Sequence, residues 1–66
     1  MISHELAIEL WYKALRAEVG IAVPTEDIIY LTQTLYNARQ VEGDEELNCL
    51  SLIKANGEVW IVRSKL

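Results

Sequence analysis

The sequence contains very few of the residues that cross-link small proteins. It has one cysteine, Cys49, and one histidine, His4, among 66 residues. A single cysteine excludes an internal disulfide, and one cysteine with one histidine does not complete a zinc site. A chain this short buries only about 60% of the surface that its unfolded form exposes, so it needs another source of stability. Association between copies is the source that remains.

Long apolar runs are also absent. No stretch approaches the roughly 18 apolar residues of a membrane span. The first residues do not show a basic region followed by an apolar run, which a secretory signal would have. We therefore expect a cytoplasmic protein that does not enter the membrane.

Basic residues are scarce. The chain has 6 Lys and Arg against 10 Asp and Glu, for a net charge of −4. All the acids except Glu58 precede residue 47, whereas half of the basic residues lie after it, at Lys54, Arg63 and Lys65. This balance disfavours a surface that tracks nucleic-acid phosphates, and it favours head-to-tail contact between copies.

Apolar residues, in contrast, are abundant, although phenylalanine is missing. They make up 52% of the chain, which is more than so small a core needs. Monomers rarely leave large apolar areas exposed, so we expect part of this excess to form a contact patch.

The first predicted helix spans residues 4–19. Ser3 is the expected N-cap, and Gly20 is expected to end the helix in the left-handed conformation. Charged residues fall on one narrow stripe, and the apolar residues cover an arc of roughly 220°. A surface helix normally buries a stripe little wider than about 100°. One hairpin and one other helix do not cover such an arc easily.

The apolar, β-branched segment 21–23 is either a plain connector or a third, edge strand beside the hairpin. Pro24 stops it in either case, because proline lacks the N–H that a strand ladder uses.

The second predicted helix spans residues 26–41. Thr25 is the expected N-cap, with Glu26 and Asp27 in the first turn, and Gly43 is the expected terminator. Apolar residues recur at helical spacing and predict the buried stripe, namely Ile28, Leu31, Leu35 and Ala38.

The last predicted element is a hairpin over residues 47–65, which turns at Asn56-Gly57. Two registers are open. A two-residue loop pairs Ala55 with Glu58, and scatters apolar residues over both faces. A three-residue loop with a bulge at Gly57 pairs Lys54 with Glu58, and gathers Leu50, Leu52, Trp60 and Val62 on one face. We prefer the second register, because it also pairs opposite charges beside the turn.

No group of residues forms a catalytic, metal or cofactor signature, so we expect a protein that is not an enzyme and binds no cofactor. His4 is interpreted as a partly buried or helix-end residue, and Cys49, inside an apolar strand, as a small core residue. The acids at Glu42 and 44–46 lack the alternating spacing of a calcium loop and predict a solvated turn.

The aromatic residues suggest contact surfaces, since tryptophan and tyrosine concentrate at interfaces. Trp60 is expected to fill the core, whereas Tyr12 and Tyr30 fall outside the main apolar stripes. The interface candidates come from three predicted elements. They are Ile8, Trp11, Tyr12 and Leu15 on the first helix, Tyr30 on the second helix, and Ile53, Val59 and Ile61 on the face of the hairpin away from Trp60.

The sequence thus predicts one α+β domain over residues 1–66, ordered α-α-β-β or α-β-α-β-β, with both helices on one face of the hairpin. Its expected function is a non-enzymatic protein–protein interaction module that self-associates as a dimer or larger assembly and meets an unidentified protein partner. The alternative is a nucleic-acid-associated regulator, resembling a winged helix or acting on a nucleic-acid-binding protein. Against direct binding, the second helix offers only Arg39 to a phosphate.

Overall fold

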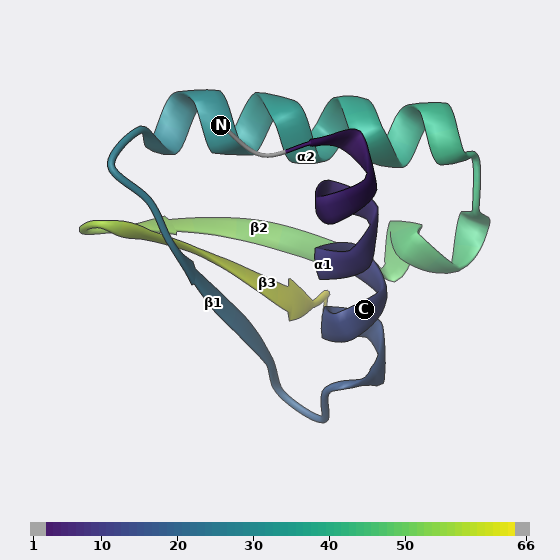
Figure 1. Cartoon of the computed structure of the whole chain (residues 1–66). Coiled ribbons are helices and arrows are strands. Elements are labelled where there is room, and N and C mark those ends of the chain that lie inside the picture. Colours follow the sequence, from purple (N-terminus) through teal and green to yellow (C-terminus); the bar gives the residue numbers. More distant parts are fainter. Residues whose placement is uncertain (1–2, 65–66) are drawn as a thin grey trace.

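The computed structural model describes residues 3–64 and has an α+β fold, as the sequence predicted (Figure 1). It includes the third strand that the sequence left open. Neither helix in this range combines the length and the apolar character that crossing a bilayer requires. In chain order, the elements are α1 (His4–Arg16), β1 (Gly20–Pro24), α2 (Ile28–Glu42), the 3₁₀ helix η1 (Glu45–Cys49), β2 (Leu50–Ala55) and β3 (Glu58–Arg63).

The three strands form one antiparallel sheet in the order β1-β3-β2. The central strand is β3, which pairs with its hairpin partner β2 on one side and with β1 on the other. The amide of Thr25 continues the β1–β3 ladder by donating to the carbonyl of Gly57 at 2.9 Å. The segment around residues 21–23 is therefore an edge strand and not a plain connector.

The hairpin has the two-residue register, so the preferred register was wrong. Ala55 lies opposite Glu58, and Ile53 lies opposite Trp60. Gly57 has a φ of +79°, and no non-glycine residue in the described range has a positive φ. Only the second turn residue is therefore left-handed, as in a type II turn. The observed register turns Val59 and Ile61 toward the helices, and burying two such side chains outweighs one exposed charge pair at the turn.

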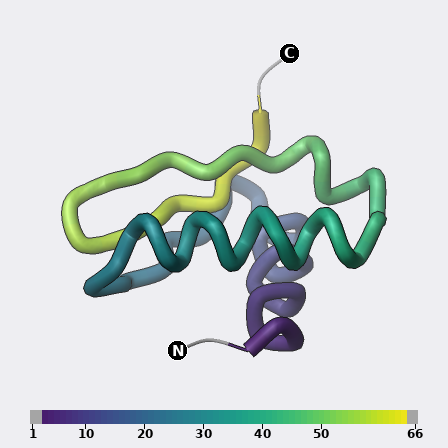
Figure 2. Tube along the Cα trace, turned by 90° about the horizontal axis from the view of Figure 1, so that it is seen from above, coloured from purple at the N-terminus to yellow at the C-terminus, as the bar shows by residue number. Residues whose placement is uncertain are grey.

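Both helices pack on one face of the sheet, with the axis of α1 running across that of α2 (Figures 1 and 2). The core lies between them and the sheet. Its fully or nearly fully buried apolar residues come from every element except β1, and they are Ala7, Trp11, Ala14, Leu31, Leu35, Ala38, Leu47, Leu50, Val59 and Ile61.

The first helix is shorter than predicted. It begins as expected, with the Ser3 hydroxyl accepting the amide of Leu6 at 3.1 Å, but it ends at Arg16 instead of residue 19. Gly20 does not terminate it. Gly20 starts β1 with a φ of +135°, and a Cβ there would collide with the carbonyl oxygen of Ile61. Close packing of β1 on β3 therefore explains this glycine better than helix capping does.

The second helix begins later than predicted. Asp27, not Thr25, is its N-cap, because the Asp27 carboxylate accepts the amide of Tyr30 at 3.0 Å. The Thr25 hydroxyl instead accepts the amide of Asp27 at 3.1 Å, which shapes the turn leading into the helix. The predicted terminator is confirmed, since Gly43 is left-handed with a φ of +71°. The solvated turn that was expected after Gly43 contains η1. Residue 65 of the predicted hairpin lies outside the described residues.

Candidate functional site

The face of the sheet opposite the helices is the most distinctive surface in the described part of the chain (Figure 1). Side chains alternate between faces along each strand, and Val59 and Ile61 point toward the helices. The neighbours of these two residues along β3, which are Glu58, Trp60 and Val62, therefore point outward. The side chains paired with them on β1 and β2 also point outward, and we call the whole set the open face: Ala22, Pro24, Ser51, Ile53, Ala55, Glu58, Trp60 and Val62.

A row of three apolar residues crosses the middle of the open face. The register places Trp60 between Ile53 on β2 and Ala22 on β1. Ile53 is 52% exposed and Trp60 37% exposed. Large apolar side chains that lie side by side in water favour contact with another apolar surface.

The open face carries little charge. Its one charged side chain, Glu58, accepts a hydrogen bond of 2.9 Å from the indole Nε1 of Trp60. This bond satisfies the polar edge of the ring and leaves its apolar surface available. Toward the other end of the face, the hydroxyls of Ser51 and Ser64 hydrogen bond to each other. Contact with another apolar surface would therefore desolvate few unpaired polar groups.

The structure divides the predicted interface candidates into two groups. Trp11, Val59 and Ile61 have 0% exposure and belong to the core of a single chain. The other candidates keep exposed or half-buried surface, but they lie on different parts of the molecule: Ile8, Tyr12 and Leu15 on α1, Tyr30 on α2, and Ile53 on the open face.

Tyr12 contacts the acidic end of α2. Its hydroxyl donates to the Asp44 carboxylate at 2.6 Å and also lies 3.3 Å from the Glu42 carboxylate. The hydrogen bond to Asp44, with partial desolvation, raises the pKa of Tyr12 well above its usual value. The pKa of Asp44 is lowered, first by the Tyr12 hydroxyl and then by the amide of Glu46. Tyr12 therefore has a structural bond that ties α1 to the start of η1.

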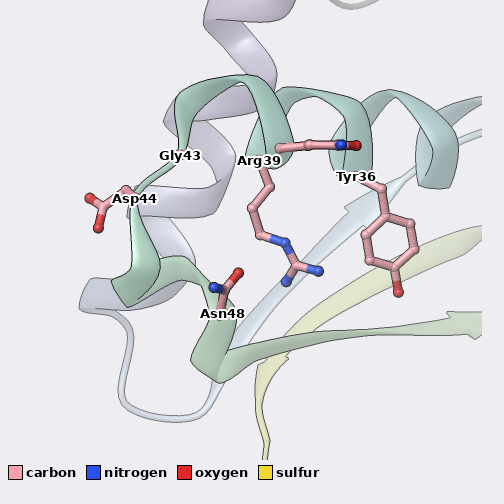
Figure 3. Close-up of a pocket in the computed structure, with 6 residues that line it drawn as sticks. Tyr36, Arg39, Gly43, Asp44 and Asn48 are labelled. Atoms are coloured by element: carbon pink, nitrogen blue, oxygen red, sulfur yellow. The ribbon is translucent and has the colours of Figure 1, made fainter.

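Arg39 joins α2 to the sheet (Figure 3). Its Nη1 donates to the carbonyls of Leu47 and Leu50 at 3.3 and 3.0 Å. Its guanidinium lies 4.8 Å from the centre of the Trp11 ring and 5.2 Å from that of Tyr36. Both stacking and charged hydrogen bonds thus hold this side chain in one orientation.

An open hollow of about 390 Å³ adjoins Arg39. In Figure 3 the side chain of Asn48 points toward the guanidinium, whereas the Asp44 carboxylate points away from it. The lining of the hollow is largely polar and consists of Tyr36, Arg39, Gln40, Gly43, Asp44 and Asn48. The hollow therefore presents hydrogen-bond donors around one fixed positive charge.

The remaining candidate residues are separate from these surfaces. His4 is exposed in the first turn of α1. Cys49 is also exposed, at the end of η1, so its interpretation as a core residue was wrong. Within residues 3–64, no three His, Cys, Asp or Glu side chains come together in a group that could hold a metal ion.

Sequence reasoning missed Trp60 and Arg39. The preferred hairpin register placed Trp60 in the core, and the two-residue loop that Asn-Gly most often forms would have placed it opposite Ile53. The sequence presented Arg39 only as the one residue of the second helix that could contact a phosphate. No local pattern indicates that its guanidinium reaches the carbonyls of Leu47 and Leu50, because this contact depends on the tertiary fold.

Comparison with protein families, curated proteins and solved structures finds no match to this chain.

Proposed function

We propose that this protein is a non-enzymatic interaction module that self-associates through the open face of its sheet. The observation that supports this most strongly is the row of Ala22, Trp60 and Ile53, which lies on a face that no helix of the described residues covers. A second copy would supply the missing apolar layer.

Two copies of the open face are compatible with each other. Sheets that pack face to face lie about 10 Å apart, with their inward side chains interdigitated. A two-fold axis near Trp60 would bring the same apolar residues of both copies together, as in other symmetric dimers. Because the indole of Trp60 donates to Glu58 within each chain, this carboxylate already has one hydrogen-bond partner at such an interface.

The expected dimer is weak. A face of three strands, each of 5 or 6 residues, measures roughly 15 by 20 Å at the usual strand spacing. This is smaller than the roughly 800 Å² that each partner contributes to a standard stable interface. Association should therefore depend on protein concentration, so that free copies remain available to other partners.

Sedimentation equilibrium over a range of concentrations tests the proposal. The wild-type mass should rise from 7.5 kDa toward twice that value. Ile53→Thr should shift the rise to higher concentration. Ile29→Thr is the matched control, because Ile29 is 66% exposed on α2 and away from the open face. A monomer at every concentration, or equal effects of the two substitutions, would contradict the proposal.

The alternative of a nucleic-acid-associated regulator receives less support. The chain has 6 Lys and Arg against 10 Asp and Glu. One of these basic side chains is already bonded within the fold, since Arg63 donates from Nη2 to the carbonyl of Leu15 at 2.6 Å. Salt-dependent retardation of nucleic acid by the purified protein would nevertheless favour this alternative.

A further inference from the structure

The outer edge of β2 is an open site for strand pairing. The amide of Ser64 donates to the carbonyl of Cys49 at 2.8 Å, which fixes which residues of β2 bond to β3. In an antiparallel ladder the bonded residues alternate, so the main-chain groups of Leu50, Leu52 and Lys54 point away from β3. Figure 2 shows β2 at the outer border of the sheet.

One end of this edge is already occupied. The carbonyl of Leu50 accepts a hydrogen bond from Arg39 Nη1. Among the described residues, no hydrogen bond uses the outward main-chain groups of Leu52 and Lys54. These two residues therefore offer two donors and two acceptors to an added strand.

The other edge of the sheet is less suitable. The bond from Thr25 to Gly57 means that Gly20, Ala22 and Pro24 direct their main-chain groups outward from β1. Pro24 has no N–H, and a proline on an edge strand protects it against pairing. Gly20 and Ala22 keep both their donor and their acceptor, but the missing donor of Pro24 interrupts this edge at one end.

The β2 edge is flanked by two positive charges. Lys54 is exposed near one end, and the Arg39 guanidinium lies at Leu50, four residues away. That spacing corresponds to about 13 Å along a strand. The hollow beside Arg39 adds the amide groups of Gln40 and Asn48. An added strand with acidic side chains at matching positions would meet a cation at each end.

These charges disfavour a second copy at the same edge. Two antiparallel β2 strands centred on Leu52 would place Lys54 of one copy opposite Leu50 of the other, where the second Arg39 lies. Like charges that face each other across strands are destabilising.

We propose that the open edge of β2 binds an extended acidic segment of a partner protein. The segment adds as a fourth strand, bonds to the main chain of Leu52 and Lys54, and places one carboxylate near Arg39 and another near Lys54. This inference rests on the proposed function only in taking the protein to be an interaction module.

Titration of ¹⁵N-labelled protein with the peptide acetyl-Thr-Glu-Thr-Val-Thr-Glu-Thr-amide tests the inference. Its two glutamates are four residues apart, as are Leu50 and Lys54. The amide signals of Leu52 and Lys54 should shift and gain protection against hydrogen exchange. Replacing both glutamates by glutamine should weaken binding by about tenfold, the combined effect expected of two partly exposed charge pairs.

Protein variants provide the matched comparison. Lys54→Glu should weaken peptide binding to a similar extent, whereas Lys13→Glu, the same change on the exposed side of α1, should leave it unchanged. A peptide that is N-methylated at its valine should bind more weakly, because it loses a main-chain donor.

Three results would overturn the inference. They are equal affinity for the glutamate and glutamine peptides, shifts that exclude Leu52 and Lys54, and protection of these two amides that rises with protein concentration when no peptide is present. The last result would assign the edge to a second copy. Loss of self-association with retained peptide binding would overturn only the dimer proposal, and the reverse outcome would overturn only the peptide site.

Discussion

The indole Nε1 of Trp11 donates a hydrogen bond of 2.7 Å to the main-chain carbonyl of Leu35. Both residues have 0% exposure, so this bond lies buried between α1 and α2. The face of the same ring lies beside the Arg39 guanidinium. Trp11 therefore connects α1 both to α2 and to the residue that holds α2 against β2. Its contacts hold α1 and α2 together within a single chain.

Trp11→Phe should lower the free energy of unfolding by about 2–3 kcal/mol. The substitution removes a buried hydrogen bond and leaves unfilled space beside Arg39. Urea unfolding measured by circular dichroism would report this loss. Val41→Ala, at a position of 74% exposure on α2, is the control and should change stability by less than about 0.5 kcal/mol. Equal effects of the two substitutions would mean that the Trp11 contact does not hold the helices together.

Gly20→Ala should be the most damaging of the glycine substitutions. The new Cβ would meet the carbonyl oxygen of Ile61 and force β1 away from β3. Gly43→Ala is the matched control, because Gly43 also has a positive φ but has no atom within 4 Å of the added Cβ. Gly43→Ala should cost about 1–2 kcal/mol for the left-handed conformation alone. Gly20→Ala should lose clearly more stability in the same unfolding experiment, and an equal or smaller loss would mean that β1 can move away from β3 without cost.

The contact between Tyr12 and Asp44 should make stability depend on pH in two ranges. The pKa of Asp44 is lowered in the folded chain, so its contribution is present above the unfolded value of about 3.9 and is lost as pH falls through the folded pKa. The pKa of Tyr12 is raised, so its contribution is complete below about pH 10 and is lost as pH rises through the higher folded value.

Ultraviolet titration of the phenols tests the alkaline range. The difference between wild type and Tyr12→Phe isolates the Tyr12 signal, whose midpoint should lie above 10, the ordinary value for tyrosine. In Asp44→Asn the midpoint should move back toward that value, because the carboxylate that opposes ionisation is gone. An unchanged midpoint in Asp44→Asn would show that this bond does not form in solution.

Much of the fold followed from local residue patterns. Apolar spacing predicted both helices, Ser3 and Gly43 gave correct caps, and Asn56-Gly57 located the hairpin turn. These features depend on neighbouring residues and on backbone preferences, which a single sequence displays directly.

The misassigned features depended on contacts between distant residues. Gly20 has the properties of a helix terminator, and only its contact with Ile61 explains why it lies in a strand. Thr25 and Asp27 are both good N-caps, and the start of the helix is decided by where β1 ends. The predicted hairpin register was wrong because burial of Val59 and Ile61 against the helices outweighs the charge pair at the turn, and this burial depends on the tertiary fold. The observed register placed Trp60 on the open face, and with it the surface on which the proposed function depends.

Isotope-filtered NOE spectroscopy on a mixture of labelled and unlabelled protein would locate the interface between two copies. It detects only contacts between different copies of the chain. We expect intermolecular NOEs from the Trp60 ring and the Ile53 methyl groups to the same residues of a second copy. Intermolecular NOEs confined to residues of α1, such as Ile8 and Tyr12, or none at a concentration where the mass shows dimer, would contradict self-association through the open face.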